Sequence, residues 1–63
     1  MSDPTDTPTD SDRQAVFAAL VEAQDRGLSV SDSRSAVADQ FDLSVQEVVR
    51  IEREGLDAGW PPL

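Results

Sequence analysis

The sequence predicts a small all-α protein: a three-helix bundle that contains a helix-turn-helix, preceded by a disordered acidic N-terminal tail. The chain has 63 residues, enough for one small domain. After residue 10, apolar residues recur at the i, i+3, i+4 spacing of an amphipathic helix. Residues 1–10 hold Pro, Asp, Ser and Thr with no apolar residue beyond Met1. We therefore divide the chain into a tail, 1–10, and a helical domain, 11–63.

The charge is strongly acidic and unevenly placed. Thirteen acidic and five basic residues give a net charge of −8, which repels DNA phosphate. Four of the acids lie in the first twelve residues, so the remainder carries nine acids and five arginines. The tail is interpreted either as a solubilising extension or as an electrostatic gate that competes with DNA for the arginines. The Asp excess and the absence of Lys fit either a GC-rich genome or a salt-adapted proteome.

The first helix is predicted over about 12–25. Ser11 or Asp10 is expected to cap it, and Gly27 supplies a left-handed stop. Phe17 and Val21 are expected to lie beside the apolar stripe. That stripe consists of Ala15, Val16, Ala19, Leu20 and Ala23.

The second helix is predicted over about 33–41, and any of Ser31, Asp32 and Ser33 can cap it. Its inward side chains are expected to be Ala36 or Val37, Ala38 and Phe41.

The third helix is predicted from Ser44 to about Ala58-Gly59. Ser44 and Glu47 have the spacing of a capping box. The helix is expected to stop there because Trp60 precedes Pro61, which disfavours the α region.

The second and third helices have the residue pattern of a helix-turn-helix. Such a motif needs a small residue where the helices cross, a turn residue that tolerates positive φ, and apolar residues that hold the second helix on the first. The residues that fill these positions are Val37, Ala38, Phe41, Asp42, Leu43, Val48 and Ile51. The alternative is an ordinary three-helix bundle with accidental spacing.

Residues Ser44–Leu56 resemble the fourth conserved region of bacterial primary-type sigma factors, which reads an upstream promoter element. The resemblance covers about 31–56 and implies a helix-turn-helix that binds promoter DNA. The matching or nearly matching residues are Ser44, Val48, Ile51, Glu52, Arg53, Glu54 and Leu56. At Val45, Glu47 and Val49 the family pattern has arginine instead.

Geometry alone predicts which side chains of the third helix face a DNA groove: Ser44, Val45, Gln46, Val49, Arg50 and Arg53. Gln pairs bidentately with adenine, Val touches a thymine methyl, and Arg binds guanine or phosphate. Arg34, near the start of the second helix, is expected to reach a backbone phosphate. The alternative for the arginines is surface pairing, Arg50 with Glu47 or Glu54 and Arg53 with Asp57.

A second set of residues indicates a protein interface. Val45, Val49 and Leu56 form an apolar strip on the third helix. Trp60 is expected either to fold back over the first helix or to anchor in a partner's pocket.

These observations favour a small DNA-binding transcription regulator, acting on double-stranded DNA as a homodimer or with a larger protein. The alternative is an acidic protein-interaction module that binds RNA polymerase, a sigma factor or itself. The chain has no His, Cys, Tyr or Lys, so we expect no enzyme activity, cofactor, metal site or small-molecule substrate. It has no apolar run of membrane length and an acidic N-terminus, so we expect a cytoplasmic protein without membrane association.

Overall fold

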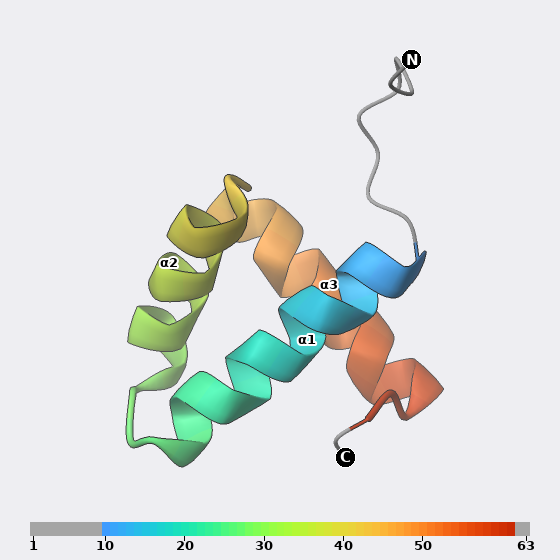
Figure 1. The fold of residues 1–63 in the computed structure, drawn as a ribbon, viewed down its shortest axis with the longest axis horizontal. Coiled ribbons are helices and arrows are strands. Elements are labelled where there is room, and N and C mark those ends of the chain that lie inside the picture. The colour runs from blue at the N-terminus through green and yellow to red at the C-terminus, as the bar shows by residue number, and fades with distance from the viewer. Residues whose placement is uncertain (1–9, 62–63) are drawn as a thin grey trace.

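A computed structural model describes residues 10–61 as three α-helices, α1 (Asp10–Asp25), α2 (Val30–Phe41) and α3 (Val45–Ala58), with no strand in that range (Figure 1). Each helix packs against the other two, and α1 crosses α3 in the view of Figure 1. The predicted all-α, three-helix class is confirmed. The predicted tail lies outside the described residues except for Asp10, which is the first residue of α1.

Each helix ends in the same left-handed motif. The backbone turns at Gly27 (φ 105°), Asp42 (φ 59°) and Gly59 (φ 68°). In each case the residue after the left-handed one donates its backbone N–H to the carbonyl of the residue five positions earlier in the chain, which is the Schellman pattern. The three bonds are Leu28 N to Ala23 O (3.2 Å), Leu43 N to Ala38 O (2.8 Å) and Trp60 N to Gly55 O (3.0 Å). The positive φ expected at Asp42 is therefore confirmed.

The helix starts differ in part from the prediction. Ser44 and Glu47 form the predicted capping box, in which the Glu47 N–H donates to Ser44 Oγ (3.1 Å). The start of α2 was predicted too late, because Ser29 is its N-cap and accepts from the Asp32 N–H (3.0 Å). The segment 29–33 contains several residues that can act as an N-cap, and the first of them, Ser29, takes that position. Ser31, Asp32 and Ser33 lie inside α2, just as Asp10 and Ser11 lie inside α1.

The core lies where the three helices meet. Its buried members are Val16, Phe17, Leu20, Val37, Ala38, Val48 and Ile51, with Phe41 and Leu43 packed against them. The apolar stripe predicted for α1 was wrong at two residues. Ala15, which was included in the stripe, is exposed, and Phe17, which was placed beside it, is buried. The ring of Phe17 removes far more apolar surface from water than a methyl group does, so α1 is rotated toward it. In α2 the inward residue is Val37, and Ala36 is exposed.

Gly55 and Trp60 close the contact between α1 and α3. A Cβ atom on Gly55 would lie 2.6 Å from Phe17 Cε1, so only glycine fits where α3 crosses this ring. Trp60 meets Phe17 edge to face, with ring centroids 6.1 Å apart and planes at 81°. Trp60 therefore folds back over α1, the first of its two predicted roles. Its use as a free anchor for a partner is not supported, because the indole is half-buried against the protein's own core.

Candidate nucleic-acid interface

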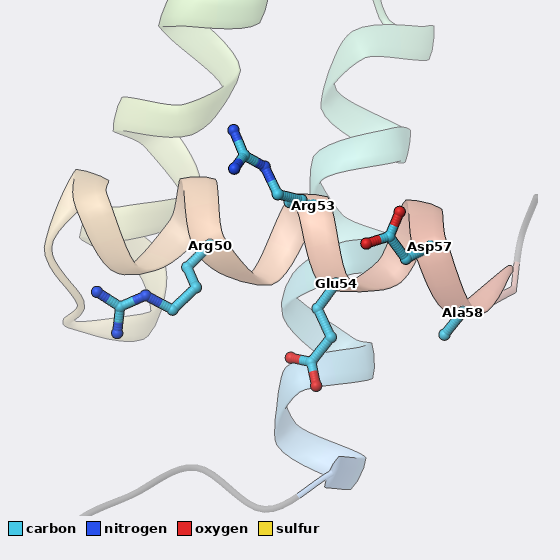
Figure 2. Close-up of a pocket in the computed structure, with 5 residues that line it drawn as sticks. All are labelled: Arg50, Arg53, Glu54, Asp57 and Ala58. Carbon is cyan, nitrogen blue, oxygen red and sulfur yellow. The ribbon is translucent and has the colours of Figure 1, made fainter.

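The outer face of α3 carries Gln46, Arg50 and Arg53, all exposed. The opposite face is buried through Val48 and Ile51, so the amphipathic pattern fixes which side chains point outward. In Figure 2, α1 and α2 lie behind α3, and the guanidinium groups of Arg50 and Arg53 extend away from the helix. They line a shallow depression of about 450 Å³ together with Glu54, Asp57 and Ala58.

Ser44 was predicted to face the groove, but it has another role. It is the N-cap of α3, and its Oγ accepts from the Glu47 N–H. A second bond of the capping box occupies the Glu47 side chain, whose Oε1 accepts from the Ser44 N–H (3.5 Å). Ser44 therefore orders the start of the helix.

The five arginines fall into two groups. Three form ion pairs within the protein: Arg13 Nε with Glu54 Oε1 (3.0 Å), Arg26 Nη2 with Glu22 Oε2 (3.5 Å) and Arg34 Nη2 with Glu52 Oε1 (2.9 Å). Within residues 10–61, Arg50 and Arg53 form no ion pair. The surface pairs predicted for them with Glu47, Glu54 and Asp57 are thus not formed. Glu47 is used by the cap of α3 and Glu54 by Arg13 of α1, whereas Asp57 has no ion pair within residues 10–61 although it lies one turn after Arg53.

The acids of α3 are turned toward its neighbours. Glu54 contacts Arg13 of α1, and Glu52 contacts Arg34 of α2. These two carboxylates lie on opposite flanks of α3, with the arginine face between them. Their charge is neutralised locally by arginines from other helices, which leaves Arg50, Arg53 and Asp57 as the charged residues of that face without an ion pair within residues 10–61.

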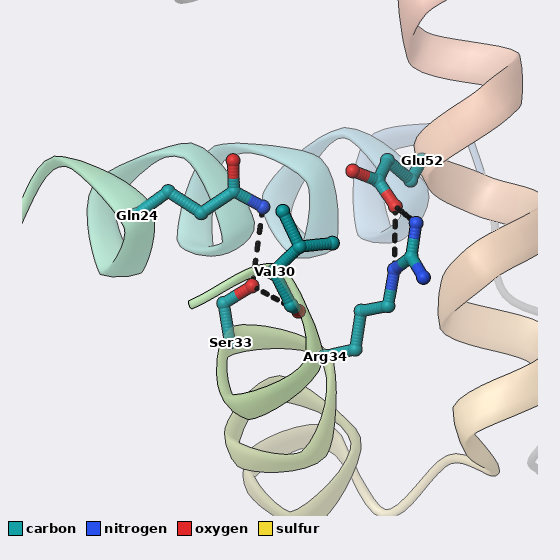
Figure 3. A network of polar contacts seen from close by, with 5 residues as sticks. All are labelled: Gln24, Val30, Ser33, Arg34 and Glu52. Atoms are coloured by element: carbon teal, nitrogen blue, oxygen red, sulfur yellow. Dashed lines mark hydrogen bonds and ion pairs between the residues drawn. The ribbon is translucent and has the colours of Figure 1, made fainter. Parts of the chain in front are cut away.

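Arg34, which was predicted to contact a phosphate, is paired with Glu52 within the protein. Its Nε and Nη2 atoms both lie 2.9 Å from Glu52 Oε1, so one carboxylate oxygen holds one edge of the guanidinium (Figure 3). The Arg34 side chain is 33% exposed and that of Glu52 17% exposed. The pair bridges α2 and α3 at their surface.

Ser33 fixes the N-terminal part of α2 that carries Arg34. It is fully buried, accepts a hydrogen bond from Gln24 Nε2 of α1 (3.1 Å) and donates to the Val30 carbonyl (2.7 Å) (Figure 3). Both polar groups of the buried hydroxyl are satisfied, so the contact fixes the approach of α2 to α1. The sequence analysis did not identify Ser33 as a buried residue. Its spacing of four residues from Val37 would have indicated this, because it places both residues on the inner face of α2.

The predicted apolar strip occupies the flank of α3 nearest α2. Val45 is 44% exposed, Leu56 57% exposed, and Val49 half-buried. Val49 and Leu56 share a depression of about 220 Å³ with Arg34, Glu52 and Arg53. The strip and the arginine face thus adjoin along one helix.

Comparison with family models, curated proteins and solved structures finds no match to this chain. The resemblance of Ser44–Leu56 to sigma factors therefore stays a prediction. No helix within residues 10–61 is both long and apolar enough to cross a membrane. The same range contains no cluster of three acidic, His or Cys side chains placed to hold a metal ion.

Proposed function

We propose that this protein is a small DNA-binding transcription regulator, in which α2 and α3 form a helix-turn-helix and α3 enters the major groove. The observation that carries the proposal is the distribution of the arginines. Within residues 10–61, the two guanidinium groups without an ion-pair partner are Arg50 and Arg53, three residues apart on the outer face of α3. Exposed, unpaired guanidinium groups on one helix face suit guanine edges and phosphate.

Two other residues predicted to face the groove, the exposed Gln46 and the half-buried Val49, also suit base contacts. Gln46 lies one turn before Arg50, and an amide there can pair bidentately with adenine. Val49 can touch a thymine methyl. One good bidentate pair contributes roughly 1–3 kcal/mol of discrimination against the wrong base.

Affinity from one such module is expected to be low. The net charge of −8 opposes approach to DNA, and two free arginines neutralise few phosphates. We therefore expect stable binding to require a homodimer or a larger DNA-bound partner, such as RNA polymerase or a sigma factor.

The test is a titration of the protein with a mixed-sequence duplex at low salt, followed by NMR. The expected result is chemical-shift changes centred on Gln46, Arg50 and Arg53. Because a mixed-sequence duplex reports phosphate contacts, Arg50→Gln should weaken binding and reduce the slope of log K against log salt by about 0.9, the value for one lost phosphate contact. Arg26→Gln is the matched control, because it removes the same charge from the exposed end of α1. If no α3 amide shifts at high micromolar protein, or if both variants weaken binding equally, the proposal is wrong.

A protein-interaction module is the second candidate, favoured by the exposed Val45 and Leu56. An exposed apolar strip marks a protein contact more often than a DNA contact. Leu56→Asp should then abolish self-association in sedimentation, or capture of a purified polymerase or sigma factor, and leave the fold intact. Binding unaffected by Leu56→Asp would exclude the strip as the interface.

A further inference from the structure

The ion pair between Arg34 and Glu52 lies at the edge of the proposed DNA-binding face. Arg34 is near the N-terminus of α2, where the helix dipole favours anions. Its side chain remains 33% exposed, so its outer N–H groups are accessible. These features suit a phosphate contact, yet Nε and Nη2 are both held by Glu52 Oε1.

We propose that Glu52 suppresses sequence-independent DNA binding by neutralising Arg34. This inference rests on the proposed DNA-binding function. A phosphate that approaches Arg34 also approaches the Glu52 carboxylate, which is 2.9 Å from the guanidinium. The attraction to one is offset by the repulsion from the other, so the pair presents almost no net charge to the duplex.

The consequence for DNA binding follows from what each contact contributes. Phosphate contacts supply nearly all of non-specific binding, whereas base contacts distinguish sequences. Neutralising Arg34 removes one phosphate contact, so it lowers the affinity for every sequence by the same factor and leaves the ratio between a specific site and non-specific DNA unchanged. A site whose bases are well read by α3 starts from a higher affinity, so it stays occupied at protein concentrations at which non-specific DNA is released.

Glu54 provides a matched comparison. It lies two residues from Glu52 on the same helix and also forms an interhelix ion pair, with Arg13 of α1. Glu52→Gln and Glu54→Gln therefore remove the same charge from α3, and each weakens one interhelix pair. Only Glu52→Gln releases the arginine next to the proposed phosphate position. A difference between the two variants isolates Arg34 from the general effect of net charge.

The experiment measures affinity for a fluorescein-labelled mixed-sequence duplex over a range of salt concentrations, because phosphate contacts need no specific site. Glu52→Gln should bind more tightly than the wild type. The slope of log K against log salt should steepen by about 0.9, the value for one added phosphate contact. Over a fourfold rise in salt, its affinity should fall about 3.5-fold more than that of the wild type. Arg34→Gln added to Glu52→Gln should restore the wild-type slope.

Three results would overturn the proposal. The first is equal slopes for Glu52→Gln and Glu54→Gln. The second is weaker binding by Arg34→Gln alone, since this would mean that Arg34 contacts phosphate while paired. In both cases the wild type still binds DNA, so the proposed function stands. The third is a failure of the wild type and every variant to bind duplex, which removes the proposed function as well. Circular dichroism and thermal melting verify the fold, and Glu52→Ala provides a second release of Arg34.

Discussion

Replacing Gly55 with alanine tests the closest contact in the fold. In most helix interiors this change stabilises, by about 0.5–1 kcal/mol, because glycine loses more backbone entropy on folding. Here the added Cβ would lie 2.6 Å from Phe17 Cε1 and 2.7 Å from Phe17 Cγ, closer than carbon atoms approach without displacement. Phe17 is buried and its ring contacts Trp60, so the ring has little room to move.

The magnitude follows from these two opposing effects. Overpacking a well-packed core costs about 1–3 kcal/mol, and a ring confined on several sides belongs in the upper half of that range. Subtracting the gain in helix propensity leaves a net loss of about 1–2.5 kcal/mol. For a domain of this size that loss corresponds to a melting temperature lower by roughly 4–20 °C.

The assay is thermal and urea denaturation of the Gly55→Ala variant, with Ser35→Ala as a propensity control at an exposed position of α2. In a Phe17→Leu background the ring is gone, and Gly55→Ala should become neutral or stabilising, with a coupling energy within the roughly 0.5–3 kcal/mol seen for residues in contact. A higher melting temperature for Gly55→Ala in the wild-type background would refute the reasoning, because it would mean that α1 and α3 do not cross this closely.

Four further outcomes are expected. Asp42→Gly should raise stability by about 0.5–1 kcal/mol in urea denaturation, because the left-handed backbone at φ 59° strains an L residue but not glycine; a lower midpoint would contradict this. Ser44→Ala should cost about 1 kcal/mol by removing the capping box, and an unchanged melting temperature would show that the cap contributes nothing. Under the proposed function, Arg13→Gln should weaken duplex binding about twofold, since the released Glu54 can pair with Arg50 at i, i+4 for about 0.3–0.5 kcal/mol. Glu54→Gln added to Arg13→Gln should restore duplex binding. If Arg13→Gln weakens duplex binding no more than Arg26→Gln does, the mechanism is excluded. Deleting residues 2–9 should tighten duplex binding at low salt, because it removes the acidic residues Asp3 and Asp6. An unchanged affinity would exclude the electrostatic gate and favour the interpretation of this segment as a solubilising extension.

Local signals in the sequence predicted the features that depend on neighbouring residues. Ser44 and Glu47 form a capping box through bonds within one helical turn. Asp42 takes positive φ because the chain must reverse between two helices, and few residues other than glycine tolerate that backbone. Val48 and Ile51 are buried because their spacing places them on one helix face. These features need no knowledge of where the other helices lie.

The features that the sequence did not predict depend on contacts between helices. Phe17 was placed beside the stripe because five aliphatic residues fit the period better, yet one aromatic ring outweighs a methyl group in buried area. The bond between Ser33 and Gln24 and the ion pair of Arg34 with Glu52 join residues 9 and 18 positions apart. Such pairings follow only when the crossing of the helices is known.

The packing of the three helices redistributes the charges of α3. Six of its residues are charged: Glu47, Arg50, Glu52, Arg53, Glu54 and Asp57. Counted along the sequence, this helix is acidic. Packing against α1 and α2 neutralises Glu54 and Glu52 through arginines from those helices, and the cap occupies Glu47. What remains on the outer face is Arg50 and Arg53, with Asp57 at the far end, so this face carries two guanidinium groups and one carboxylate that form no ion pair within residues 10–61. This distribution depends on the packing of the three helices, because the arginines that pair with Glu52 and Glu54 come from α2 and α1.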